Sequence, residues 1–400
     1  MTRSAKIALT VACLAMPLLS ASVQAAGPNC TSDGWLKKSD AAFAADCADM
    51  AFQGNLEERQ RLAWMFFARV NQLVAAPPHK DGSKGGMSGT GKVPVWMAWP
   101  TDPDTFGTTR PFEFNATPRS EMRPSTEKKD IESGQIATAD PDSANEEVTR
   151  NKVSYDYLIR NGLTTKLDVA AYFKEHDYVD MPVGSVELKA SWLQVTDGSP
   201  APEGALTFEF DSGEYWWRGL HIMVKMQSLK DPGDAFYTEE PSWFWTTFEF
   251  NDNPGVARVR EALITQRAPL PGDEIAAILE GAGLADFGFR AYAPNGTQIR
   301  FTVDGTGETP VILGHTDMED FAGSPNTAQP RYWNRFEASC HGCHATAAYN
   351  PKTEAFFPFS VPTGALDPGY NMTDKGGTVR YLGQGYKPLD FMWPIAFQAR

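Results

Sequence analysis

The pentapeptide Cys340-His341-Gly342-Cys343-His344 carries the most narrowly defined chemistry in this sequence. Its pattern, C-x-x-C-H, is the attachment signature of a c-type haem. Two thiols at this spacing can form thioethers to the two haem vinyl groups, and the histidine that follows ligates the iron. The sequence therefore predicts one covalent haem c, bound through Cys340 and Cys343, with His344 as the proximal iron ligand.

Three other interpretations of the motif compete with haem attachment. A zinc site would need two more ligands at suitable spacing, and the remaining histidines are scattered singly along the chain. A thioredoxin-like redox pair is expected at a strand-to-helix junction early in a βαβ unit, whereas this motif lies late and precedes a histidine. A structural disulfide between Cys340 and Cys343 is the third alternative.

The N-terminus predicts export. Two basic residues precede an apolar run from Ile7 to Leu19, and a small-residue site follows at Ala25 and Ala26. This is the pattern of a secretory signal peptide, and the apolar run is too short to span a bilayer. Because covalent haem attachment takes place outside the bacterial inner membrane, the two features agree. We expect a signal peptide over residues 1–26 and a periplasmic protein without a stable membrane span.

Two further cysteines, Cys30 and Cys47, lie close together at the start of the predicted mature chain. Disulfides form readily in exported proteins. We therefore expect a Cys30–Cys47 disulfide and no catalytic role for either thiol.

The chain is acidic, with 36 Lys and Arg against 50 Asp and Glu and a formal net charge of −14. This balance argues against a nucleic-acid partner, since nucleic-acid-binding surfaces are rich in Lys and Arg. A basic redox partner protein would complement such a charge, and the solubility of an exported protein explains it equally well.

Hydrophobic periodicity predicts an α+β body with an antiparallel sheet, because strands and helices do not alternate as βαβ units. Helices are expected over residues 56–74, 151–163, 273–281 and 332–339, and strands over 186–195, 206–210, 215–226, 243–250 and 299–303. Residues 117–150 are expected to form a polar surface excursion. A minimal monohaem cytochrome needs only about 100 residues. We expect residues 27–325 to form the body and residues 326–400 a haem-attachment segment packed on it.

The sixth iron ligand distinguishes an electron carrier from a catalyst. Strand alternation places His221, Met223 and Lys225 on the face opposite Leu220 and Ile222. His221 is the preferred histidine candidate, although a hydrogen-bonded histidine on a half-buried sheet explains it as well. The other candidates are His315, the methionines Met223, Met372 and Met392, and an open position. His79 and His176 are expected to be solvated.

Aromatic residues are dense between residues 216 and 248, and they could line the haem as well as the core. The set comprises Trp216, Trp217, Trp243, Phe244, Trp245 and Phe248.

Several segments together resemble one known group. They are Gly219–Ile222 with Lys225, Pro241–Glu249, Asn251–Pro254, Asn151–Leu163 and Val186–Trp192. In these patches the sequence is similar to exported bacterial proteins of the "cytochrome c family protein" group. The resemblance implies a single covalent haem, electron transfer and a site role for His221, and it names no substrate. The chain departs from the group's pattern at Phe250 and fits it only loosely over residues 332–337.

These features lead us to expect a periplasmic monohaem c-type cytochrome that transfers electrons. The alternative is an enzyme, a haem-c peroxidase or oxygenase with an open distal iron site, for which the large body is an argument. Peroxide-splitting c-type enzymes commonly use a second haem, and this chain holds one C-x-x-C-H motif. A haem-based sensor, or a subunit of a dehydrogenase, is a third class.

Overall fold

The structure is a computed structural model of the chain. It describes residues 30–31, 34–80, 82, 85–87, 90–107, 112–114, 117–123, 145–229, 242–253, 270–299, 302, 311, 313–316, 318, 340–345, 347–357 and 385–399. The predicted signal peptide, the predicted helix over 332–339 and Met372 lie outside these residues.

Helices and strands alternate irregularly along the chain. The helices are α1 (Asp40–Phe52), α2 (Leu56–Val70), α3 (Asp102–Phe106), α5 (Lys152–Arg160), α6 (Lys166–Tyr172), α9 (Gly272–Gly281), α10 (Cys340–His344) and α11 (Trp393–Gln398), with short 3-10 turns at Trp35–Lys37, Val95–Ala98 and Phe289–Ala291. The strands are β1 (Leu73–Ala75), β2 (Gly86–Met87), β3 (Lys92–Pro94), β4 (Asn145–Arg150), β5 (Val186–Gln194), β6 (Thr207–Phe210), β7 (Gly213–Lys225), β8 (Trp243–Phe250), β9 (Tyr292–Gln298), β10 (Ala348–Asn350), β11 (Ala355–Phe356) and β12 (Lys387–Pro388).

Strand β7 is the centre of the main sheet. β5 pairs along one of its edges, while β6 pairs with the first part of the other edge and β8 with the last part. β4, β2 and β9 extend the sheet outward from β5, β6 and β8. Because every one of these pairs is antiparallel, the described residues form the α+β fold that the sequence predicts.

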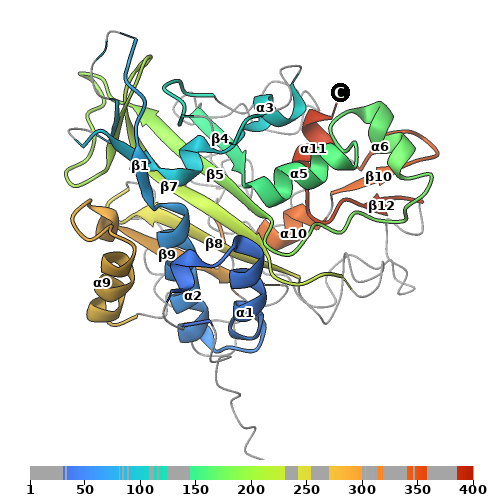
Figure 1. The fold of residues 1–400 in the computed structure, drawn as a ribbon, viewed down its shortest axis with the longest axis horizontal. Coiled ribbons are helices and arrows are strands. Elements are labelled where there is room, and N and C mark those ends of the chain that lie inside the picture. The colour runs from blue at the N-terminus through green and yellow to red at the C-terminus, as the bar shows by residue number, and fades with distance from the viewer. Residues whose placement is uncertain are drawn as a thin grey trace, which may run out of the picture.

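One face of the sheet is covered by helices from the N-terminal part of the chain and by α9. Figure 1 shows α1, α2 and α9 together on one side of the long strands. Helix α2 begins at a capping box, in which Asn55 accepts from the Glu58 N–H at 2.9 Å and the Glu58 carboxylate accepts from the Asn55 N–H. Its Phe67 ring stacks on Phe248 of β8 with the ring centroids 4.0 Å apart. This face therefore belongs to a large aromatic core.

The opposite face carries the C-terminal part of the chain. In Figure 1, α10, α11, β10 and β12 lie beside α5 and α6. A second hydrophobic cluster joins Met223 of β7 and Trp245 of β8 to Leu158 of α5 and to Phe391 and Ile395 near the C-terminus. The sheet thus separates two cores, and the C-x-x-C-H helix α10 lies with the second.

Most predicted elements are present, with boundaries moved by a few residues. Helix α5 begins after its cap Asn151 and ends at Asn161, and Gly162 adopts the left-handed conformation of a helix C-cap at φ 65°. Strand β5 carries Val186, Leu188, Ala190 and Trp192 into the aromatic core, as the alternation predicts.

Three predictions of secondary structure were wrong. Helix α2 ends at Val70, and Leu73–Ala75 forms strand β1. Asn145–Arg150, predicted as surface chain, is strand β4, because its charged side chains are paired inside the protein. The sequence predicted no strand over Tyr292–Gln298, which forms β9. Of the strand predicted over 299–303, residues 300, 301 and 303 lie outside the described residues, and Ile299 and Thr302 are not part of a strand. Pro294 and Gly296 have low strand propensity, so propensity does not predict β9. This strand tolerates them because it lies at the outer edge of the described sheet.

Cys30 and Cys47 form a disulfide in the structure, in agreement with the sequence prediction. Both cysteines are fully buried, and the bridge ties the first described residues to helix α1. Among the described residues, no helix has both the length and the apolar character needed to cross a membrane.

Candidate functional site

The C-x-x-C-H helix α10 contacts one end of a row of residues that runs across the sheet. Glu187, Met223, Trp245 and Gln298 are successive cross-strand partners on β5, β7, β8 and β9. Partners directly opposite each other in an antiparallel pair project from the same face. The Gln298 side-chain oxygen accepts a 2.9 Å hydrogen bond from the backbone N–H of His341. This contact sets helix α10 against the outer strands of the sheet.

His344, the predicted iron ligand, is held from two directions. Its Nδ1 lies 2.8 Å from the backbone oxygen of Phe391, and its ring centroid lies 4.8 Å from that of Trp245. A carbonyl oxygen can only accept, so the geometry assigns the proton of a neutral imidazole to Nδ1 and the lone pair to Nε2. Metal-ligating histidines usually donate their second ring nitrogen in this way. The arrangement therefore suits His344 as an iron ligand.

The first cysteine of the motif lies at the same site. Cys340 and His344 are four residues apart on helix α10 and therefore lie on one side of it. The Cys340 sulfur lies 3.1 Å from the backbone oxygen of Leu313. His341 is buried, with its ring 4.8 Å from that of Phe391. The side chain of Cys343 lies outside the described part of the structure.

The structure places His221, Met223 and Met392, three of the candidate sixth ligands, on the side of the sheet that bears helix α10. His221 pairs across the strands with Thr247, which lies two residues after Trp245 on β8. The Nδ1 of His221 lies 2.6 Å from the Thr247 hydroxyl. Met223 lies directly opposite Trp245 and, like Met392, belongs to the second hydrophobic cluster. Which side chain completes the iron coordination stays a prediction.

A buried polar cluster lies next to His221. The Glu249 carboxylate of β8 is fully buried and accepts hydrogen bonds from the Asn253 amide at 2.6 Å and the Asn295 amide at 2.8 Å, as well as from the hydroxyl and backbone N–H of Thr316. His315 is fully buried with its Nδ1 3.7 Å from this carboxylate.

Strand β7 makes room for His315 at Gly219. This glycine has φ +150°, and a Cβ there would lie 2.8 Å from the His315 ring and 2.1 Å from the Phe248 carbonyl. A side chain is therefore sterically excluded, and the two histidine rings come to 6.0 Å between centroids across the position. The cluster offers groups that could hold or transfer protons beside helix α10.

A buried ion pair involves Asp390, the residue before Phe391. The Asp390 carboxylate is fully buried and lies 2.7 Å from the Lys225 ammonium, which is also fully buried. Burial raises the pKa of the Asp390 carboxyl, because the charged form is costly away from water, and the Lys225 charge opposes that shift. The pair therefore places charge inside the second hydrophobic cluster.

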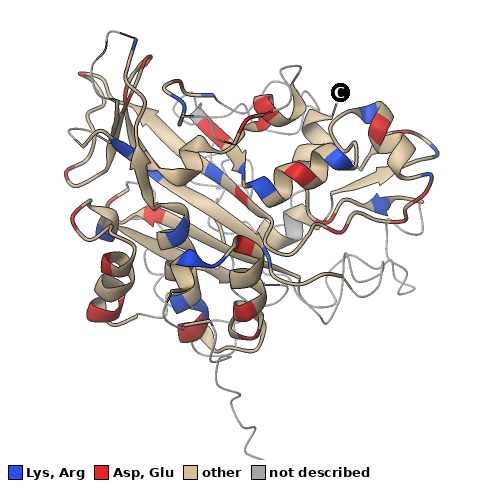
Figure 2. Ribbon diagram, in the orientation of Figure 1, with Lys and Arg blue, Asp and Glu red and all other residues tan. Residues whose placement is uncertain are grey.

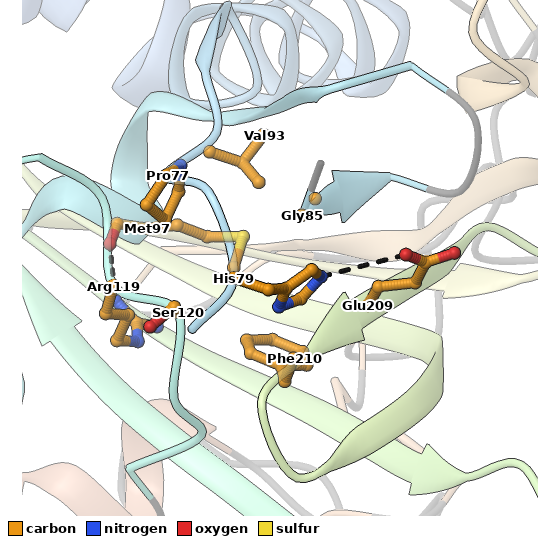
Figure 3. A pocket seen from close by; sticks show the side chains of 10 residues that line it. Pro77, His79, Gly85, Val93, Met97, Arg119, Ser120, Glu209 and Phe210 are labelled. Atoms are coloured by element: carbon orange, nitrogen blue, oxygen red, sulfur yellow. Dashed lines mark hydrogen bonds and ion pairs between the residues drawn. The ribbon is translucent and has the colours of Figure 1, made fainter. Parts of the chain in front are cut away.

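A small pocket lies apart from helix α10, between the loop before β2 and strand β6 (Figure 3). His79 is the titratable group at its centre. Its Nδ1 lies 3.2 Å from Asp211 and its Nε2 lies 3.7 Å from Glu209, and its side chain is 11% exposed. The expectation that His79 is solvated was therefore wrong, because the imidazole lies mostly covered between the carboxylates of Asp211 and Glu209. His176 is exposed, as predicted, and stacks on Tyr172.

Strand alternation divides the dense aromatic segment that the sequence shows. Trp243 and Trp245 face helix α10, whereas Phe244 and Phe248 pack in the opposite core. Applied to residues 243–248, the alternation would have made this division from the sequence. No sequence signal points to Gln298, Leu313 or Phe391, since they act through a side-chain amide or a backbone oxygen at distant positions.

The described residues contain no group of three or more His, Cys, Asp or Glu side chains that could hold a metal ion. Comparison with known proteins gave no match to this chain among protein-family models, curated proteins or solved structures.

Proposed function

We propose that this protein is an exported monohaem c-type cytochrome that transfers electrons. In this proposal the haem is attached through Cys340 and Cys343, and His344 is the proximal iron ligand. The single observation that carries the proposal is the 2.8 Å hydrogen bond from His344 Nδ1 to the Phe391 carbonyl, combined with the C-x-x-C-H motif. The motif names the chemistry, and the hydrogen bond supports the ring orientation and tautomer that an iron ligand needs.

The surroundings of His344 favour a redox role. Trp245 is 3% exposed, and Phe391, Met392 and Leu313 are buried beside helix α10. A bound haem would supply a reversible one-electron couple. Apolar walls raise the potential of such a couple, because they disfavour the more highly charged oxidised iron. In this proposal, these residues hold the imidazole and surround it with apolar groups, while His344 and Cys340 themselves stay partly exposed.

The partner that we propose is a basic redox protein. The chain carries a formal net charge of −14. Figure 2 shows Asp and Glu on α1 and α9, and neither helix carries Lys or Arg. Long-range attraction between opposite charges accelerates encounter with such a partner and weakens with added salt. The periplasm is the proposed location, on the basis of the signal-like N-terminus.

Haem attachment can be tested directly. The full chain, with its N-terminal segment, is expressed in bacteria that carry a haem-c maturation system. We expect a haem-staining band that survives denaturation and an intact mass larger than the polypeptide by one haem. Replacing both Cys340 and Cys343 by Ala should abolish both signals, because no thiol of the motif then remains to form a thioether.

A matched control uses the other cysteine pair. Replacing both Cys30 and Cys47 by Ala removes the described disulfide and should leave the haem mass unchanged. A wild-type chain that carries the unmodified polypeptide mass under these conditions would contradict the proposal, as would a variant without both Cys340 and Cys343 that still stains.

A second candidate function is a haem-c peroxidase or oxygenase with an open distal iron position. The observation that favours it is the pair His221–Thr247 and His315–Glu249 on the side of the sheet that bears helix α10. An iron that is low-spin and inert to cyanide and peroxide supports the electron carrier. A high-spin iron that reacts with both supports the enzyme.

The same spectra can assign the sixth ligand. If His221 ligates the iron, His221→Ala should convert the spectrum to a high-spin, cyanide-reactive form while Met223→Leu leaves it unchanged. The reverse result assigns Met223.

A further inference from the structure

The Asp390 carboxylate is the centre of a hydrogen-bonded clamp. One oxygen accepts from the Trp243 indole N–H at 2.9 Å. The other accepts from the Lys225 ammonium at 2.7 Å and from the Met181 backbone N–H at 2.6 Å. The three donors come from β8, β7 and the segment before β5, so Asp390 is tied to the sheet at several points. Carboxylates satisfied by charged and neutral donors in this way are held rigidly.

Lys225 is itself held in place. Its ammonium lies 3.0 Å from the Asp180 carboxylate in addition to Asp390, and 5.5 Å from the centre of the Trp243 ring. A buried cation between two carboxylates and an aromatic face has little freedom to reorient. The position of Asp390 is therefore set by Lys225 and Trp243 of the sheet and by the segment before β5.

The backbone at Asp390 and Phe391 is in a disfavoured conformation. Asp390 has φ 50° and Phe391 has φ 67°, two consecutive residues in the left-handed region without a glycine. Such residues persist only where surrounding contacts hold them. The turn directs the Phe391 carbonyl toward His344, and the same oxygen accepts the Trp393 backbone N–H at 3.1 Å.

We propose that Asp390 is a positioning residue for His344, acting through the Asp390–Phe391 turn. The clamp on its carboxylate keeps the turn in the left-handed conformation, and the turn presents the carbonyl that receives the His344 Nδ1 proton. Lys225 and Trp243 act indirectly, because they hold the Asp390 carboxylate in place. The inference rests on the proposed function where it concerns iron, whereas the link from Asp390 to the His344 tautomer concerns the polypeptide alone.

Two consequences follow for His344. If the clamp is lost, the turn relaxes and the Nδ1–H tautomer is no longer favoured over the Nε2–H tautomer. A haem-bound imidazole that loses this hydrogen bond donates less electron density to the iron. The oxidised state is then less stabilised, and the midpoint potential rises.

The first measurement uses the haem-free full-length protein. The ring ¹⁵N chemical shifts of His344 report the ratio of its two neutral tautomers. Asp390→Asn replaces an acceptor oxygen by an NH₂ group that cannot accept from Lys225 or Met181. We expect the Nδ1–H to Nε2–H ratio to fall about tenfold, which corresponds to the loss of one hydrogen bond.

Glu147→Gln is the matched control. The Glu147 carboxylate is also fully buried and accepts from a cation, Arg119, at 2.9 Å and from a backbone N–H, that of Arg123, at 2.7 Å. It lies on β4, away from helix α10. This variant should lose stability and leave the His344 tautomer ratio unchanged.

Trp243→Phe separates positioning from charge. It removes one donor to Asp390 and no charge, so it should shift the ratio in the same direction as Asp390→Asn, by a smaller factor. It also decides the question if Asp390→Asn does not fold. In the haem-loaded protein, both variants should raise the midpoint potential relative to wild type and Glu147→Gln.

Folded Asp390→Asn and Trp243→Phe variants that both keep the wild-type tautomer ratio would overturn the proposal, and so would a Glu147→Gln variant that shifts it equally. If the wild-type chain takes up no haem, the proposed function fails, and the tautomer ratio still decides whether Asp390 positions His344.

Discussion

The two faces of the central sheet have different chemistry. On one face, β7 and β8 meet α2 through apolar contacts such as Phe67 on Phe248. On the other, the same strands present His221, Lys225 and Glu249 to the interior, each with polar partners. Apolar packing stabilises a fold without specifying chemistry, whereas buried polar groups cost stability unless they are paired. The comparison indicates that the first face stabilises the protein and the second organises its chemistry.

The largest expected effect tests the apolar face. Phe67→Ala removes a fully buried ring that stacks on Phe248, and the free energy of unfolding should fall by about 3–5 kcal/mol. Leu167→Ala is the control, since Leu167 is 80% exposed and should change stability by less than about 0.5 kcal/mol. Urea unfolding measures both, and the absorption spectrum of attached haem should stay unchanged. A changed spectrum in folded Phe67→Ala would break the division between the faces.

An intermediate effect compares one tryptophan from each face. Trp217 and Trp245 are both buried, and neither indole N–H has a hydrogen-bond partner among the described residues. Replacing either by Leu should cost about 2–4 kcal/mol, because a similar volume is lost. Only Trp245→Leu should also shift the Soret band and the midpoint potential, since its ring contacts His344. Equal spectral shifts in the two variants would contradict the assignment of the site to one face.

The smallest effect concerns a carboxylate outside both cores. Burial raises the pKa of Asp211, but hydrogen bonds from Ser120 and His79 and the charge of Lys80 lower it more, so the net pKa is below the ordinary 3.8. This is opposite in direction to Asp390, whose pKa burial raises. A carboxyl whose pKa is lower in the folded than in the unfolded protein stabilises the fold at pH values above its unfolded-state pKa. This stabilisation is lost as the pH falls through the folded-state pKa.

The corresponding variant is Asp211→Asn. Wild type should be more stable than Asp211→Asn at neutral pH, and the difference should shrink as pH falls below the ordinary value of 3.8. Thermal unfolding of both proteins across this range measures it. Ser120→Ala, which removes one hydrogen bond and keeps the charge, should give a smaller change of the same sign. A stability difference that does not vary with pH would show that the Asp211 charge contributes nothing.

Local patterns in the sequence predicted most elements that pack through one apolar face. Alternation identified β5, β7 and β8, and it correctly separated His221, Met223 and Lys225 from the aromatic core. It failed for β4 and β9. β4 buries charges that look like surface residues, such as Arg150 paired with Glu187, and β9 contains Pro294 and Gly296. In both strands long-range pairing outweighs local propensity.

The sequence by itself determined the local chemistry of this protein: a C-x-x-C-H motif, an acidic chain, and strands whose faces can be assigned by period-two alternation. Only the tertiary structure decided what surrounds His344. The Phe391 carbonyl is 47 residues away from it, and the Lys225 that pairs with Asp390 is 165 residues from its partner. Local periodicity records which side of a strand is buried, but not which distant segment covers it. That choice depends on how the whole chain packs, and here it brings a strained C-terminal turn against the motif.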